Sequence, residues 1–152
     1  MDEVPDGDFH QLLKENTSDI LKFFGKLPPQ KHSYAYAEDK WTVKQVVQHI
    51  IDTERVFSFR ALVVSRGDLA QLPAFDEDDY AAKADTSDRS MQSLLEEFAA
   101  VRQSTALLFA HMTNADSAFL GNGPTHPVTA RALGFMLIGH ARHHIQVVAD
   151  RY

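Results

Sequence analysis

Apolar residues recur every three or four positions along four stretches of the chain, which is the pattern of helices with one buried face. These stretches are residues 8–26, 42–66, 89–112 and 129–150. Pro28 and Pro29 end the first, because proline cannot continue a helix, and Gly67 is expected to end the second. We see no strand-like alternation of any length. The pattern therefore predicts an all-α fold, a four-helix bundle.

The connection between the second and third predicted helices, residues 68–88, is unusually long for a bundle. It contains Leu72-Pro73 and the acidic run Asp76-Glu77-Asp78-Asp79. Within it, residues 76–83 are expected to form a short helix. Connections of this length often carry function, so this one is a candidate functional loop.

The composition is that of an ordinary globular protein. Apolar residues make up 44% and charged residues 24% of the 152 positions, and we expect residues 1–152 to form a single domain. The net charge of −6 argues against a nucleic-acid-binding surface. The absence of cysteine excludes disulfides, a thiolate zinc site and a cysteine nucleophile.

The sequence also bears on where the protein works. No apolar run is long enough to cross a membrane, so no membrane interaction is expected. The acidic N-terminal residues lack the basic and apolar regions of a signal peptide. A cytoplasmic location is therefore expected.

Two histidines near the end of the chain, His140 and His144, are the main candidates for chemistry. Residues four apart lie on one face of a helix, about 6 Å apart along its axis, so both imidazoles can reach one divalent metal ion. Both fall at the edge of the apolar face of their helix, whereas His143 points away. His49 falls at the corresponding edge of the second predicted helix. Three neutral imidazoles would leave at least one coordination position open.

The residues alone leave a second interpretation open. A single histidine at the edge of a core is more often hydrogen-bonded to a carbonyl than bound to a metal. A helical wheel also cannot show which helices are neighbours. A zinc-protease motif is excluded, because it requires glutamate after the first histidine and this chain has Ala141. The remaining histidines, expected to be structural or exposed, are His10, His32, His111 and His126.

Two charged residues fall within the apolar stripes. Glu54 lies on the stripe of the second predicted helix and Arg102 on that of the third. A charge is seldom buried without a partner. Either the two side chains form an internal ion pair, or both extend to solvent along their apolar stems.

Several segments together resemble the DinB-like superfamily of metal-binding four-helix bundles. They are Trp41-Thr42, Gln48-His49-Ile50-Ile51-Asp52-Thr53-Glu54-Arg55-Val56-Phe57, Arg60-Ala61-Leu62, Leu72-Pro73-Ala74-Phe75-Asp76 and Gly139-His140-Ala141-Arg142-His143-His144. The segments follow the family order and span nearly the whole chain. The resemblance implies that His49, His140 and His144 bind a divalent metal, which in the family is zinc, nickel, iron or manganese. It also implies a homodimer, for which Phe59 and Phe135 are candidate exposed apolar contacts.

The resemblance does not fix an activity, because relatives include thiol-dependent transferases, domains of iron enzymes and proteins without an assigned reaction. We expect a metal-dependent enzyme of the transferase or hydrolase type that acts on a small-molecule substrate. Because the chain has no cysteine, any thiol must be a low-molecular-weight cosubstrate. Arg60 is expected to orient an anionic substrate, and the loop around Asp76 to close the site. The alternative is a non-catalytic metal-binding module of a stress response.

Overall fold

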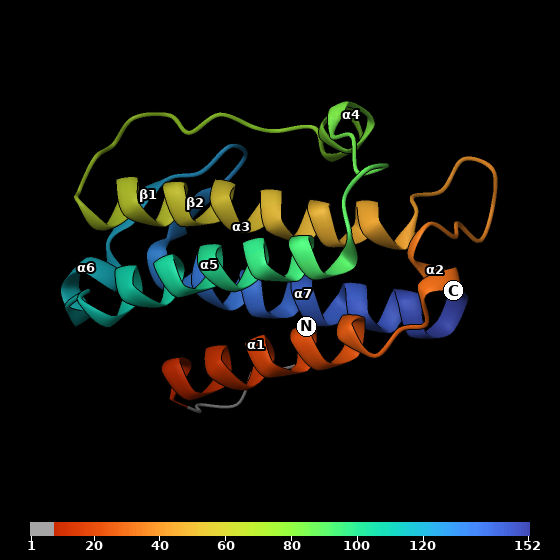
Figure 1. Ribbon diagram of the computed structural model, residues 1–152. Helices are drawn as coiled ribbons and strands as arrows, with labels where there is room; N and C mark the ends of the chain where they lie inside the picture. The colour runs from red at the N-terminus through yellow and green to blue at the C-terminus, as the bar shows by residue number, and fades with distance from the viewer. Residues whose placement is uncertain (1–7) are drawn as a thin grey trace.

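Four long helices form the fold in residues 8–152, the part of the chain that the computed structural model describes (Figure 1). They are α1 (Phe9–Gly25), α3 (Val43–Ser65), α5 (Met91–Ala110) and α7 (Ala130–Arg151). Each lies within two residues of a range predicted from the apolar pattern. The prediction of an all-α four-helix bundle is confirmed.

Side-chain caps explain where these helices begin. The hydroxyl of Thr42 accepts a hydrogen bond from the backbone N–H of Gln45, and the Gln45 side chain accepts one from the Thr42 N–H, at 3.2 and 2.8 Å. This reciprocal capping box satisfies amide groups that the first turn leaves unpaired. The hydroxyls of Ser90 and Thr129 cap α5 and α7 by accepting from the backbone N–H groups of Ser93 and Ala132, without the reciprocal side-chain bond. Gly67, with a φ of 73°, lies just beyond the end of α3, as predicted.

The order of the helices around the bundle explains the long connection. α3 packs against both α5 and α7, and α1 packs against the other side of α5 and α7. Figure 1 shows α3 and α5 running in the same direction, with α1 and α7 antiparallel to them. The chain must therefore return along the length of the bundle between α3 and α5. This return segment contains α4 (Glu77–Lys83), the predicted short helix, with Asp76 as its N-cap.

Two short helices and a pair of short strands were not predicted. α2 (Pro29–His32) and α6 (Asn114–Ala118) each span little more than one turn, and β1 (Leu120–Asn122) pairs antiparallel with β2 (Pro127–Thr129). The sequence indicated a turn at Gly121-Asn122-Gly123-Pro124 but no strands. Strands of three residues are too short to show a period of two, so the apolar pattern could not reveal this pair.

An ion pair is buried among the apolar side chains of the core. Ile20, Phe24 and Phe98 are fully buried, and Glu54 and Arg102 are also buried, with 1% and 2% exposure. Arg102 Nε and Nη2 donate to the two Glu54 carboxylate oxygens at 2.8 and 3.0 Å. Arg102 Nη1 also donates to Asn16 Oδ1 at 2.8 Å. The internal ion pair is therefore confirmed, and the alternative in which both side chains extend to solvent is excluded.

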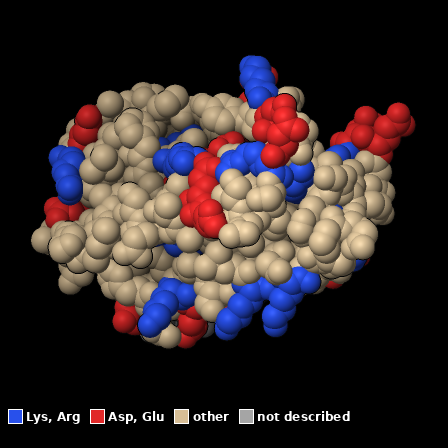
Figure 2. All heavy atoms as spheres, in the orientation of Figure 1, with Lys and Arg blue, Asp and Glu red and all other residues tan. Residues whose placement is uncertain are grey.

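The surface carries charges of both signs. On the face shown in Figure 2, acidic and basic side chains lie next to one another rather than in a large patch of one sign. Arg55 of α3 pairs with Glu97 of α5, and Arg89, just before α5, pairs with the same carboxylate. Within residues 8–152, no helix combines the length and apolar character needed to cross a bilayer.

Candidate metal centre

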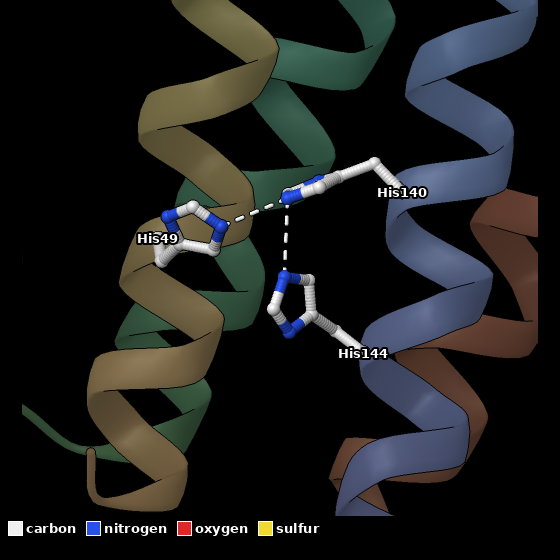
Figure 3. A group of neighbouring side chains, drawn as sticks. All are labelled: His49, His140 and His144. Atoms are coloured by element: carbon white, nitrogen blue, oxygen red, sulfur yellow. Dashed lines mark hydrogen bonds between the residues drawn. The ribbon is translucent and has the colours of Figure 1, made fainter. Parts of the chain in front are cut away.

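Two adjacent helices bring the three predicted histidines together. α3 carries His49, and α7 carries His140 and His144 one turn apart, with all three rings pointing into the space between the helices (Figure 3). The Nε2 atom of His140 lies 2.8 Å from Nε2 of His49 and 3.1 Å from Nε2 of His144. Each histidine offers one ring nitrogen, and the three nitrogens lie within 4.8 Å of one another. His49 is 4% exposed and the other two are half-buried.

Hydrogen bonding among the rings does not account for this convergence. A neutral imidazole nitrogen is either a donor or an acceptor, so His140 Nε2 cannot donate to one neighbour while it accepts from the other. Metal ions are held by convergent nitrogen lone pairs of this kind. His144 Nδ1, on the far side of its ring, is buried without a hydrogen-bond partner. The three converging ring nitrogens therefore fit the ligands of a divalent ion better than they fit a metal-free hydrogen-bond network.

Burial keeps the three imidazoles neutral. It lowers the pKa of His49 to about 4, against a smaller opposing effect of Asp78. Burial also lowers the pKa of His140 to about 3 and that of His144 to about 4, and neighbouring histidines add to both shifts. At neutral pH the rings are therefore unprotonated, which is the state that binds metal ions.

An aromatic residue lies against the histidine cluster, which has three potential protein ligands among the described residues. Trp41 covers His49, with ring centroids 4.8 Å apart. The Tyr152 hydroxyl donates to the Trp41 carbonyl at 2.7 Å and ties the end of α7 to this region. Among residues 8–152 the cluster contains three side chains of metal-binding type, and no acidic residue joins them. Three protein ligands with an open position are typical of catalytic sites, whereas four-ligand sites are structural.

The other predicted site residues lie outside the cluster. Arg60 is 7% exposed on α3, and its Nη2 donates to the Pro73 carbonyl at 2.7 Å. Asp76 is exposed, and its carboxylate accepts from the Asp79 N–H at 3.0 Å, which caps α4. His143 is exposed, as expected. Asp78 is close enough to His49 to influence its pKa, and sequence reasoning did not single it out.

Comparisons with known proteins agree with this architecture. The family model described as the DinB superfamily matches residues 12–148. A curated relative from Oceanobacillus iheyensis, named as a candidate metal-dependent hydrolase, is 28% identical over 83 residues. That match covers 53% of this chain and 48% of the relative, so the chain spans about half the length of the relative it matches.

Two solved structures from Bacillus subtilis share the fold. YfiT, described as a candidate metal-dependent hydrolase with an unusual four-helix bundle topology, has a TM-score of 0.82 and 18% identity. The match covers 99% of this chain and 89% of YfiT. The DinB-like protein YjoA has a TM-score of 0.65 and 16% identity, over 95% of this chain and 90% of YjoA. At these identities the likeness establishes the fold alone.

Proposed function

The chain belongs to the DinB superfamily, and from that membership and its histidine cluster we propose that it is a divalent-metal-dependent hydrolase of a small-molecule substrate. The observation that carries the proposal is the convergence of three neutral imidazole nitrogens, from His49, His140 and His144, with no fourth protein ligand among residues 8–152. The name of the curated relative supports the same reaction class.

The residues of the site suit this chemistry. A divalent ion bound there would lower the pKa of a coordinated water toward about 7 and polarise a substrate carbonyl. The three histidines would hold the ion as neutral ligands, since burial keeps their pKa values low. Trp41 packs on the His49 ring and limits its rotation. Any thiol used in a transfer reaction at this site would have to be a small molecule, because the chain has no cysteine.

Replacing His140 or His144 with alanine is expected to abolish stoichiometric metal binding. Each substitution leaves two imidazoles, which hold a divalent ion far more weakly than three. Metal content is measured by elemental analysis after loading with Zn²⁺, Ni²⁺, Mn²⁺ or Fe²⁺ and removing excess ion. His143→Ala is the matched control, since His143 is exposed and outside the cluster. Full metal content in both the His140→Ala and His144→Ala variants would refute the assignment.

A hydrolysis screen with the metal-loaded protein separates enzyme from binding module. Activated esters and amides are the first substrates to test, each with and without a low-molecular-weight thiol. Turnover that disappears on chelation and in His140→Ala supports the hydrolase. Turnover that requires the thiol would instead identify a transferase. Stoichiometric metal with no turnover of any compound would favour the non-catalytic module.

Static light scattering at micromolar concentration is expected to show a homodimer. Phe59 and Leu62, on successive turns of α3, are 53% and 39% exposed, and dimerisation would bury them. Phe135 is a poorer candidate than the sequence indicated, because it is half-buried against Phe9 at 5.4 Å between ring centroids. Phe59→Lys should then shift the dimer toward monomer, with Leu107→Lys as an equally exposed control on α5. A monomer at every concentration would contradict this expectation.

A further inference from the structure

Three buried side-chain atoms in residues 8–152 have no hydrogen-bond partner, and they mark one strip of the molecule. They are Thr53 Oγ1, Arg60 Nε and His144 Nδ1. On α3, Thr53 lies one turn beyond His49, and Arg60 lies three turns beyond it, all within about 40° around the helix. Buried polar groups without partners are rare and need an explanation. This strip runs from the histidine cluster to Arg60.

Arg60 is a buried cation without a carboxylate partner among the described residues. Its one hydrogen bond there is to the Pro73 carbonyl. Its guanidinium carbon lies 5.3 Å from the ring centroid of Phe57 and 5.7 Å from that of Phe75. A cation–π contact is weak compared with the cost of burying an unpaired charge. The two aromatic rings therefore do not replace an anion. Burial lowers the pKa of Arg60, and no acidic group opposes it.

Arg60 faces a cavity of about 370 Å³ between α3, the loop before α4, the β-hairpin and α7. Apolar side chains line most of it, and the polar lining includes Arg60 and His126. Met136, at its edge, precedes His140 by one turn of α7, about 6 Å along the axis. Asp76, which follows Phe75, caps α4 and does not neutralise Arg60. The cavity thus combines an unpaired cation, an apolar wall and proximity to the histidine cluster.

We propose that this cavity binds the carboxylate end of an elongated substrate with an apolar body. The carboxylate pairs with Arg60, whose planar donor fork matches its geometry. The body contacts Phe57, Phe75 and Met136, and the opposite end reaches the histidine cluster. His49 and Arg60 are about 16 Å apart along α3, and the arginine side chain leans toward the N-terminus of the helix, which shortens that span. The placement of the opposite end of the substrate at the histidine cluster rests on the proposed hydrolase function. The carboxylate subsite at Arg60 does not.

Binding of hexanoate to the metal-free protein tests the subsite directly. Hexanoate and hexanamide share an apolar body and differ in charge, and ¹⁵N NMR can follow the Arg60 Nε–H resonance during each titration. We expect hexanoate to shift this resonance saturably and to bind at least about tenfold more tightly than hexanamide, a difference of about 1.4 kcal/mol. Arg60→Met should lose the preference for hexanoate. Arg66→Met, at the exposed end of the same helix, should retain it.

Three results would overturn the subsite: equal affinity for hexanoate and hexanamide, unchanged hexanoate binding in Arg60→Met, or inorganic phosphate binding as tightly as hexanoate. Should Arg60→Met fail to fold, the titration of the Arg60 Nε–H in the unmodified protein still decides between the outcomes. Because these measurements need no metal and no turnover, a failed hydrolysis screen would leave their result unchanged. Absence of hexanoate binding would likewise have no bearing on the assignment of the metal site.

Discussion

Removing either partner of the Glu54–Arg102 pair is expected to lower the free energy of unfolding by about 3–5 kcal/mol. Both side chains are at most 2% exposed, so each single substitution leaves the other charge buried without its bidentate partner. Such a loss is a large part of the stability of a typical domain, about 5–15 kcal/mol. Denaturant titration of Glu54→Gln and Arg102→Met measures it.

The double variant distinguishes a coupled pair from two independent side chains. With both charges removed, no charge is left buried without a partner. The free energy of unfolding of the double variant should therefore fall by less than the sum of the two single losses, with a coupling of about 0.5–3 kcal/mol. Arg55→Met is the matched control. Its partner Glu97 is also an acidic residue across the α3–α5 contact, but the Arg55 side chain is 51% exposed, so its loss should cost about 0–1 kcal/mol. Coupling near zero would contradict an energetically linked pair.

The four long helices could be predicted because their signals are local. Each has an apolar stripe several turns long, and residues of capping type, such as Thr42 and Thr129, stand at their starts. The cost of burying either charge alone made an ion pair between Glu54 and Arg102 one of two alternatives, and the structure decided between them. Asn16, the third member of that network, could not be identified, because an asparagine on a helix carries no sign of its distant partner.

The candidate site was predictable in part because two of its three histidines are close together in the sequence. His140 and His144 are neighbours within one helix, so their spacing alone places them together. The position of His49 beside them depends on α3 packing against α7, which the residue pattern does not determine and which the family resemblance supplied. The Arg60 cavity depends on the loop at Pro73 and a hairpin of two three-residue strands, whose positions are set by tertiary packing.

Acid is expected to destabilise the metal-free protein well above the pH at which carboxylates titrate. In the unfolded chain each histidine of the cluster binds a proton near its ordinary pKa of 6.5, whereas burial lowers the folded-state pKa to about 4, 3 and 4 for His49, His140 and His144. Between pH 6.5 and about 4 the unfolded state therefore holds more protons, and the free energy of unfolding falls as the pH falls. Well above pH 6.5 the rings are unprotonated in both states, and this dependence vanishes.

Each histidine contributes at most about 1.4 kcal/mol per pH unit within this window, and less where solvent reaches its ring. Denaturant titration in the presence of a chelator, at several pH values from about 7 to 5, avoids most carboxylate titration. The variant that carries His49→Gln, His140→Gln and His144→Gln is the control. It keeps every carboxylate, including Asp52, whose pKa is raised by burial, and removes only the three imidazoles. The native sequence should lose stability over this range and the triple variant should lose much less. Equal slopes for the two proteins would show that the cluster does not exclude protons in the folded state, and would remove the electrostatic basis for a preformed neutral metal site.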